Sequence, residues 1–170
     1  MFHIVFVEPE IPPNTGNAMR TVVVTGASLD LIQPLGFEMD DTRLRRAGLD
    51  YRDRAVVNVY PDLPSWHEQV QPPRIWAFTV DGTHLYTDVR YQPGDALMFG
   101  KESTGLDDAA KTAPWVTGSV RLPMLPDVRS MNLSNATAVA LFEAWRQNDF
   151  AGSRGGVTRP VPGRIGDVDH

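Results

Sequence analysis

Short apolar runs alternate with amphipathic stretches along most of the chain, and this alternation predicts the elements of the fold. Continuous runs of apolar and β-branched residues, bounded by turn residues, indicate buried strands. We expect six strands, at residues 3–7, 29–34, 55–60, 74–80, 95–100 and 118–124. Helical patterns lie between most of them, at residues 14–26, 40–48, 63–70, 105–113 and 131–148.

Strands that alternate with helices are typical of an α/β fold. The runs IWAFTV (75–80) and ALMFG (96–100) lack strict polar alternation, as expected where both faces of a parallel sheet are covered. The 170 residues suffice for one well-buried domain. We therefore expect an α/β domain over residues 1–150, with a mainly parallel six-stranded sheet and helices on both faces.

The last predicted helix is apolar on two sides. One stripe at helical spacing comprises Leu133, Ala136, Thr137, Ala140, Leu141 and Ala144, and a second comprises Met131, Ala138, Phe142 and Trp145. A helix with two apolar sides must be buried on both. We expect the first stripe to face the sheet and the second to face a partner subunit.

The composition changes after Phe150, where Gly, Pro and Arg replace most large apolar residues. This composition predicts a flexible tail over residues 151–170. The beginning of the chain has no basic region ahead of its short apolar run, so it does not read as a secretory signal. No apolar run approaches the roughly 20 residues of a membrane-spanning helix, and we expect a cytoplasmic protein with no membrane association.

Composition excludes several kinds of chemistry. The chain has no cysteine, so disulfides, thiolate nucleophiles and cysteine-bound zinc are impossible. The net charge of −5 is unlike the basic footprint of a dedicated nucleic-acid binder. Residues 43–54 nevertheless hold five arginines against two aspartates. Such a segment is either a local patch for phosphates or an ordinary solvated helix face.

Ligands of open parallel sheets bind beyond the carboxyl ends of the strands. Three predicted strand ends carry unusual sequences there: FTVDG (78–82), FGKESTGL (99–106) and RLPMLPDVRSMNLSN (121–135). The polar run at 129–135 contains more Ser and Asn than a helix cap needs, because one such residue caps a helix. We therefore expect the three loops to form one pocket lined largely by main chain.

Familiar phosphate-binding motifs are absent from these loops. The Lys101 segment fails the P-loop pattern because position 95 is Asp and position 102 is Glu. No G-x-G-x-x-G follows the first strand, and Glu8 and Glu10 in that connection would repel a pyrophosphate. His3 lies in a predicted strand, His170 is the last residue, and His67 and His84 have no acidic partner at catalytic spacing, so none is expected to be catalytic. No cluster of metal-ligating residues stands out, and we expect no metal cofactor.

Three motifs resemble one family. NTGNAMR (14–20), LMFGKESTGL (97–106) and LPMLPDVRSMNLSNATAVALFEAWR (122–146) are similar to the motifs of the SPOUT-superfamily RNA 2′-O-ribose methyltransferases. EPEIPPNTGN (8–17) and RLRRAGLDY (43–51) point to the small TrmL-like branch, which methylates the wobble nucleotide of tRNA. The resemblance extends from Met1 to about Phe150.

The resemblance implies S-adenosylmethionine as cofactor, a C-terminal trefoil knot, and a homodimer formed through the N- and C-terminal helices. It implies a cofactor site at Phe78, Thr79, Gly100, Glu102, Leu122, Met124, Ser130, Met131 and Leu133. For Glu102 two roles stay open: a charge facing the cofactor, or a cap or salt bridge that holds its loop. The tRNA anticodon loop is the implied partner, with phosphate contacts expected from Arg43, Arg45, Arg46, Arg52 and Arg129.

The resemblance also implies the catalytic residues. Arg20 is assigned there as the base, with Asn14 as its companion, and Ser130 and Asn132 lie at the reaction centre. A guanidinium stays protonated in proteins, so we expect an arginine to grip phosphate and stabilise a developing alkoxide instead. Two alternatives stay open: an RNA-binding module of the same fold without activity, and a 2′-O-methyltransferase for another RNA site.

Overall fold

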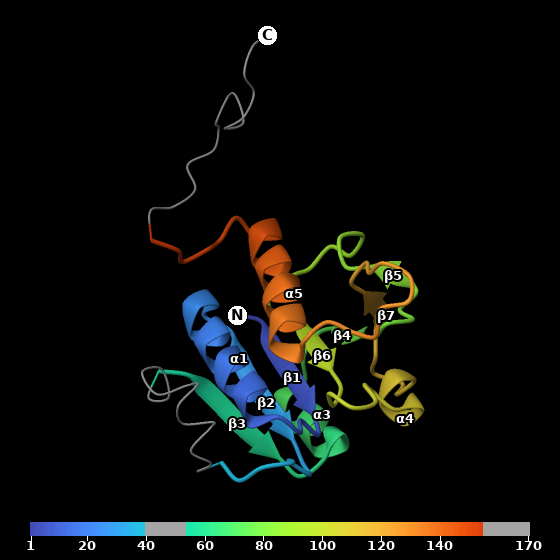
Figure 1. Ribbon diagram of the computed structural model, residues 1–170. Helices are drawn as coiled ribbons and strands as arrows, with labels where there is room; N and C mark the ends of the chain where they lie inside the picture. The colour runs from blue at the N-terminus through green and yellow to red at the C-terminus, as the bar shows by residue number, and fades with distance from the viewer. Residues whose placement is uncertain (40–53, 155–170) are drawn as a thin grey trace.

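The computed structural model describes residues 1–39 and 54–154 and shows a parallel sheet between two layers of helices (Figure 1). Its strands are β1 (His3–Val7), β2 (Ser28–Ile32), β3 (Val56–Tyr60), β4 (Ile75–Phe78), β5 (His84–Leu85), β6 (Ala96–Phe99) and β7 (Gly118–Arg121). Its helices are α1 (Pro12–Thr25), α3 (Leu63–Val70), α4 (Asp108–Lys111) and α5 (Leu133–Gln147). All paired strands are parallel, in the order β3-β2-β1-β6-β4-β7-β5.

Side chains of the central strands alternate between two separate cores. In β1, Ile4 and Phe6 point into a core that contains Ala18 and Met19 of α1 and Leu141 of α5, all buried. Val5, between them in sequence, belongs to a second core with Trp66 of α3 and Ala110 of α4. Because successive residues of a strand face opposite sides of the sheet, the two cores confirm that helices cover both faces.

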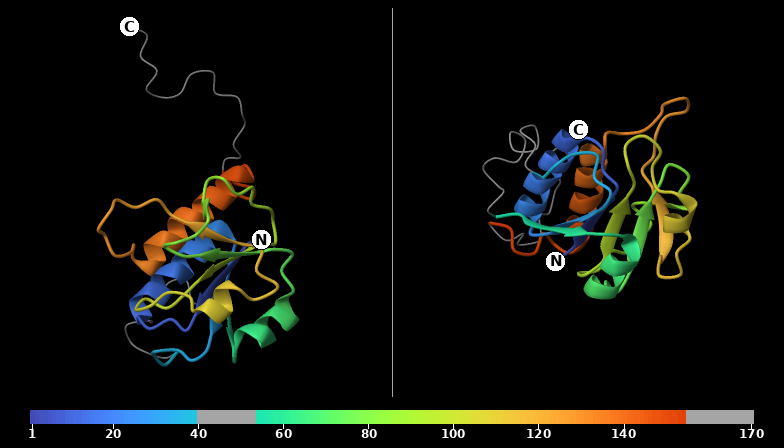
Figure 2. Two further views of the ribbon diagram at one scale, coloured as in Figure 1. Left: turned by 90° about the vertical axis from the view of Figure 1, so that its right-hand side faces the viewer. Right: turned by 90° about the horizontal axis from the view of Figure 1, so that it is seen from below.

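Helices α1 and α5 lie side by side over one face of the sheet, as Figures 1 and 2 show from different directions. Helix α1 begins with Pro12 and Pro13. Proline is tolerated there because the first N–H groups of a helix have no partner within the helix. Gly26 ends it in the left-handed conformation, with φ of 71°. The buried stripe of α5 includes Leu133, Thr137, Ala140, Leu141 and Ala144, so the expectation for its sheet-facing side is confirmed.

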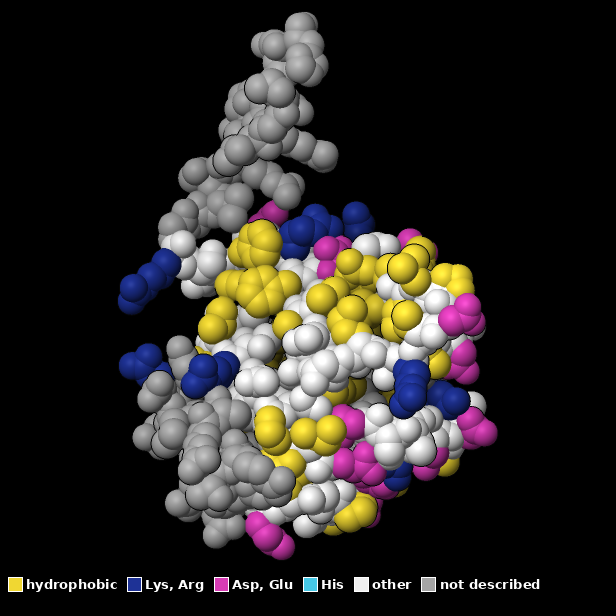
Figure 3. All heavy atoms as spheres, in the orientation of Figure 1, with side chains coloured by type: hydrophobic (Ala, Val, Ile, Leu, Met, Phe, Trp, Pro, Cys, Tyr) yellow, Lys and Arg dark blue, Asp and Glu magenta, His cyan; other side chains and the backbone are white. Residues whose placement is uncertain are grey.

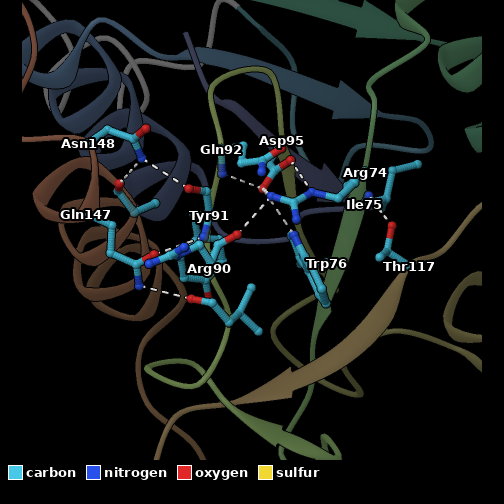
Figure 4. A network of polar contacts seen from close by, with 12 residues as sticks. Arg74, Ile75, Trp76, Arg90, Tyr91, Gln92, Asp95, Thr117, Gln147 and Asn148 are labelled. Atoms are coloured by element: carbon cyan, nitrogen blue, oxygen red, sulfur yellow. Dashed lines mark hydrogen bonds and ion pairs between the residues drawn. The ribbon is translucent and has the colours of Figure 1, made fainter.

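The far end of α5 is fixed by a polar network centred on Asp95 (Figure 4). The buried Asp95 carboxylate accepts a bidentate pair of bonds from Arg74, at 2.9 and 2.6 Å. Gln147 Nε2 donates to the carbonyl of Val89, and the amide of Tyr91 donates to Gln147 Oε1 at 2.9 Å. The chain leading into β6 is therefore bonded to the last turn of α5.

Several sequence-based boundaries were wrong. Within the described residues the sheet has seven strands rather than six, because His84 and Leu85 form a short strand beside β7. Strand β7 ends at Arg121, and residues 122–124 belong to a loop instead. Helix α4 is limited to residues 108–111, although a helix was expected over 105–113. The expected helix at 40–48 and most of the expected tail, residues 155–170, lie outside the described residues.

The ends of the strands decide where a ligand can enter. Since all strands run in one direction, the carboxyl ends of β1, β4, β6 and β7 meet at the same edge of the sheet. The loops that follow these four strands are the β1–α1 loop (8–11), the β4–β5 loop (79–83), the β6–α4 loop (100–107) and the β7–α5 loop (122–132). Across residues 1–39 and 54–154, every helix is too short or too polar to cross a bilayer.

Candidate active site

A cavity of about 800 Å³ opens at this edge of the sheet, within the size range of small-molecule sites. All three predicted strand-end loops line it, together with the first turn of α1 and the start of α5. The expected cofactor residues among its lining are Phe78, Thr79, Gly100, Glu102, Leu122, Met124, Ser130, Met131 and Leu133. The structure therefore brings together the whole set that the sequence motifs suggested.

Two aromatic rings form part of the cavity lining. Phe78, at the end of β4, stacks on Phe99, at the end of β6, with 4.7 Å between ring centroids. Phe6 of β1 meets Phe99 in an edge-to-face arrangement, with 6.2 Å between ring centroids. Adjacent parallel strands that both end in phenylalanine thus give this side of the cavity a rigid apolar surface, suited to a flat apolar ring system.

Close backbone contacts hold the β6–α4 loop at its base. A Cβ atom at Gly100 would lie 2.0 Å from the carbonyl carbon of Gly105, so only glycine fits there. The amide of Gly105 donates to the carbonyl of Lys101 at 2.8 Å. Gly82 meets a similar limit, because a Cβ there would lie 2.3 Å from the carbonyl carbon of Val120.

A chain of three side chains connects the cavity loops. Glu102 Oε1 accepts a bond from Asn14 Nδ2 at 2.9 Å, and Asn14 Oδ1 accepts one from Asn132 Nδ2 at 2.8 Å. Glu102 also accepts the amides of Glu10 and Ile11, at 2.7 and 3.2 Å. Both carboxylate oxygens of Glu102 are thus engaged by the β1–α1 segment, the geometry expected of a residue that holds its loop.

Asn132 performs a second task at the start of α5. Its Oδ1 accepts the amides of Ser134 and Asn135 at 3.0 and 3.2 Å, as an N-cap does, and also the Ser134 hydroxyl at 2.7 Å. One residue of the polar run therefore caps the helix and reaches α1 at the same time. Ser130, two residues earlier, lines the cavity as Asn132 does, and it takes no part in this cap.

The β7–α5 loop differs from the other cavity walls. Within the part of the chain that the structure describes, residues 123–131 make no hydrogen bond. Asp127 in this loop has φ of 63°, in the left-handed region. The loop's main-chain N–H and C=O groups are thus left to solvent or to a ligand in the cavity. By contrast, the amide of Thr79 is already donated to Val120 at 2.9 Å.

The residues expected to act in catalysis lie at two different places. Asn14, Ser130 and Asn132 line the cavity, whereas Arg20 does not. Asn14 is buried and Arg20 is exposed, because six residues of helix place them on different sides of α1. Of the arginines expected to contact RNA, Arg129 lines the cavity. Arg43, Arg45, Arg46 and Arg52 lie outside the described residues.

Four residues to which the sequence motifs assigned no role in the site connect the β1–α1 and β6–α4 loops. The Glu10 carboxylate accepts both the amide and the hydroxyl of Ser103, each at 2.9 Å. Lys101 Nζ lies 2.6 Å from Glu8 Oε2, and this hydrogen bond raises the pKa of the lysine. No spacing rule could have found these pairs, because about 90 residues separate their members.

The donor set of the cavity fits an organic ligand better than a metal. Among the described residues, no group of three His, Cys, Asp or Glu side chains could hold a metal ion. The stacked phenylalanines and the side chains of Leu122, Met124 and Leu133 offer an apolar surface. Residues 123–131 of the β7–α5 loop offer main-chain polar groups. These features define a small-molecule site on a parallel α/β fold.

Comparison with known families identifies the class more closely. Residues 1–142 match the SpoU rRNA Methylase family, and the chain belongs to this family. A curated relative from Saccharophagus degradans, named tRNA (cytidine(34)-2′-O)-methyltransferase, is 49% identical over 91% of this chain and 100% of its own length. A relative of the same name from Escherichia coli strain K12 is 48% identical, over 90% of this chain and 98% of its own.

Solved structures show the same fold. One, from a study of 2-OH methylation of C/U34 on tRNA, superposes with a TM-score of 0.81 at 39% identity. The superposition covers 87% of this chain and 96% of the chain in the solved structure. The SpoU methyltransferase AviRb from Streptomyces viridochromogenes, in complex with the cofactor AdoMet, has a TM-score of 0.78 at 22% identity. This likeness covers 86% of the chain and 57% of AviRb, and it shows the fold alone.

Proposed function

We propose that this protein transfers a methyl group from S-adenosylmethionine to the ribose 2′-hydroxyl of the wobble nucleotide, position 34, of tRNA. The target nucleotide is cytidine or uridine. The observation that carries the proposal is the convergence of the three strand-end loops on one cavity in a chain 49% identical, over nearly its full length, to a tRNA (cytidine(34)-2′-O)-methyltransferase.

The cavity has the groups that S-adenosylmethionine requires. Phe78, Leu122, Met124 and Leu133 give an apolar surface for the adenine ring, and the main chain near Gly100 and Met131 gives polar groups for adenine and ribose. When bound, the cofactor supplies a methyl group on a positively charged sulfur, and transfer to the ribose oxygen leaves S-adenosylhomocysteine. Glu102 supports this site indirectly, since its carboxylate is bonded to the β1–α1 segment.

Ser130 and Asn132 act at the reaction centre. Both line the cavity, and Asn132 is oriented before the substrate arrives, because it donates to Asn14 and accepts the amides of α5. Positioning of this kind lowers the barrier because the reacting groups need no further ordering. The hydroxyl proton leaves to water or to a neighbouring phosphate as the new C–O bond forms.

Arg20 binds the target nucleotide from outside the cavity. Its exposed position on α1 suits a residue that grips the phosphate and stabilises the developing alkoxide as a charged donor. The arginines at positions 43, 45, 46, 52 and 129 extend the phosphate contacts along the anticodon loop. The ribose of the target nucleotide must therefore lie between Arg20 on the surface and Ser130 and Asn132 in the cavity.

The active form is a homodimer that assembles through α1 and α5. Val139 and Phe142 on α5 are 39% and 42% exposed, and hydrophobic side chains gather over this part of the surface in Figure 3. In such a dimer, the arginines of one subunit present the anticodon loop to the cavity of the other. The proposal includes a C-terminal trefoil knot around the cavity loops, a catalytic domain over residues 1–150, a flexible tail over 151–170, and a cytoplasmic location.

Methyl transfer to tRNA tests this function directly. Purified protein is incubated with tritiated S-adenosylmethionine and total tRNA from cells that lack this enzyme, and the modified nucleoside is mapped. We expect label in 2′-O-methylcytidine or 2′-O-methyluridine at position 34. Label at another RNA site, or binding of S-adenosylhomocysteine without any transfer, would overturn the proposal in favour of one of the two alternatives.

The variant Arg20→Ala tests the residue that lies outside the cavity. We expect at least a hundredfold loss of turnover on tRNA, because removal of one charged transition-state donor costs about 10²–10³ in rate. Titration with S-adenosylhomocysteine should give the affinity of the unmodified protein, since Arg20 does not line the cavity. Near-normal turnover would refute an essential role for Arg20.

A further inference from the structure

The β1–α1 and β6–α4 loops bind one another through a reciprocal set of carboxylate contacts, which we call the clasp. It consists of Glu8, Glu10, Lys101, Glu102 and Ser103. Glu10 of the first loop accepts bonds from Ser103 of the second, and Glu102 of the second accepts the amides of Glu10 and Ile11 of the first. Each loop therefore supplies a carboxylate to the main chain of the other.

The clasp holds the tip of the β6–α4 loop, where the backbone of that loop makes few bonds of its own. Lys101 and Gly105 are bridged at the base of the β6–α4 loop, where Gly105 donates to the Lys101 carbonyl at 2.8 Å. Between these two residues, within the described part of the chain, the hydrogen bonds of Glu102 and Ser103 all go to the β1–α1 loop or to Asn14. Both residues line the cavity. The tip of the loop is thus positioned from outside.

The first loop is in turn fixed by its own neighbours. The amide of Glu8 donates to Ile32 at 2.9 Å, and the amide of Gly36 donates to the Pro9 carbonyl at 2.9 Å. A Cβ at Gly36 would lie 2.8 Å from the Cα of Glu10, so the segment after β2 packs directly against the clasp. The backbone of Glu10 is therefore held in place, and the bonds of its carboxylate hold Ser103 in place in turn.

We infer that Glu10 is a positioning residue for the cofactor: by holding Ser103 it keeps the β6–α4 loop in the conformation that binds S-adenosylmethionine. This inference rests on the proposed function for the identity of the ligand. Glu10 does not line the cavity itself and acts through Ser103, which does. Loss of such a residue weakens ground-state and transition-state binding alike, so it raises KM and leaves kcat unchanged.

The matched control is Asp62. Its carboxylate also accepts the amide of a serine, Ser65, at 2.7 Å, and it caps α3 instead of joining two cavity loops. Both carboxylates thus stabilise the protein through the same kind of bond. Only Glu10 is connected to the cavity wall, so the two variants separate a loss of stability from a loss of cofactor affinity.

The test compares Glu10→Ala, Glu10→Gln, Ser103→Ala, Asp62→Ala and the double variant Glu10→Ala/Ser103→Ala. We expect Glu10→Ala to raise the dissociation constant for S-adenosylhomocysteine and the KM for S-adenosylmethionine about tenfold, with kcat within twofold of the unmodified protein. Glu10→Gln keeps one acceptor oxygen and should be intermediate. Ser103→Ala loses the hydroxyl bond alone, and adding it to Glu10→Ala should cost nothing further, because Glu10 is the one partner of that hydroxyl among the described residues.

Asp62→Ala should lower the midpoint of thermal unfolding and keep the affinity for S-adenosylhomocysteine. Unchanged affinity in Glu10→Ala, an equal loss in Asp62→Ala, or a fall in kcat at constant KM would each overturn the inference. The titration needs no RNA substrate. If the unmodified protein binds S-adenosylhomocysteine and fails to methylate tRNA, the proposed function is refuted while the role of Glu10 is still decided by the titration.

Discussion

Asn132 Nδ2 lies 2.8 Å from Asn14 Oδ1 and donates a hydrogen bond to it, although 118 residues separate the two side chains. The bond joins the N-cap of α5 to the first turn of α1. Asn14 passes the connection on to Glu102 through its own amide nitrogen. One buried asparagine therefore connects the first turn of α1 to the N-cap of α5 and to the β6–α4 loop.

The variant Asn14→Ala removes both of these bonds. It leaves Asn132 Nδ2 and one acceptor position of Glu102 to solvent, since Asn132 is exposed and Glu102 is half-buried, and each lost hydrogen bond costs about 1 kcal/mol. We expect the free energy of unfolding to fall by about 2 kcal/mol in urea denaturation. The control is Asn17→Ala, because Asn17 is an exposed residue of the same helix and should change stability only slightly. Equal effects at both positions would contradict this interpretation of Asn14.

Gly100 limits what the cavity wall can tolerate. In Gly100→Ala the new methyl group would lie 2.0 Å from the carbonyl carbon of Gly105, so the loop must move away from its present place. We expect a cost of about 3 kcal/mol or more in unfolding free energy, with loss of measurable binding to S-adenosylhomocysteine in calorimetry.

Gly26 is the matched control for Gly100. It has φ of 71° and open space where a Cβ would be. Gly26→Ala should cost about 1 kcal/mol, from backbone strain alone, and should bind S-adenosylhomocysteine normally. Normal binding by Gly100→Ala would show that the wall moves without consequence for the ligand.

Glu143 should make part of the protein's stability dependent on pH. Its hydrogen bonds from Arg146, at 2.7 and 2.8 Å, hold the pKa of this carboxyl below its usual value of 4.5. A carboxyl with a lowered pKa in the folded state stabilises the protein above the unfolded pKa, and this contribution is lost as the pH falls through the folded pKa.

Carboxyl groups titrate roughly between pH 3 and pH 6. Over this range we expect the free energy of unfolding in urea to depend less steeply on pH in Glu143→Gln than in the unmodified protein. The two stability curves should differ most at the upper end of this range and approach one another at the lower end. Parallel curves throughout would show that Glu143 titrates alike in the folded and unfolded chains.

The exposed stripe of α5 predicts dimerisation. Phe142 is 42% exposed and its ring contacts Trp145 edge to face, with 5.7 Å between centroids. Phe142→Glu would place a charge in the proposed interface, so we expect sedimentation at micromolar concentration to show a monomer. Val56→Glu, on the edge strand β3, is the control and should remain dimeric. An unmodified protein that sediments as a monomer would exclude the dimer.

Sequence patterns predicted the elements whose signals are local. Continuous apolar runs placed β1, β4 and β6 correctly, because both faces of these strands are buried in the two cores. The apolar stripe of α5 was likewise visible at helical spacing. Strand β5 was missed because two residues carry no period, and His84 and Leu85 pair only because β7 passes beside them.

The errors at the cavity have a common physical cause. Leu122 and Met124 read as the end of a strand, because apolar residues that line a cavity and apolar residues that fill a core look alike in sequence. The motifs identified the cavity residues. They could not show that the Glu102 carboxylate accepts hydrogen bonds from the β1–α1 loop. Nor could they find the bond between Glu10 and Ser103, since contacts across 93 residues leave no local pattern.

The all-parallel sheet constrains the order in which the chain can assemble during translation. Strands β1, β2 and β3 are neighbours in both sequence and sheet, so they can pair as soon as they leave the ribosome. The other edge of β1 pairs with β6, where His3 meets Ala96, and that edge stays unprotected until the second half of the chain emerges. Nascent chains that stall before β6 should consequently expose the unpaired, apolar edge of β1, a surface that chaperones bind.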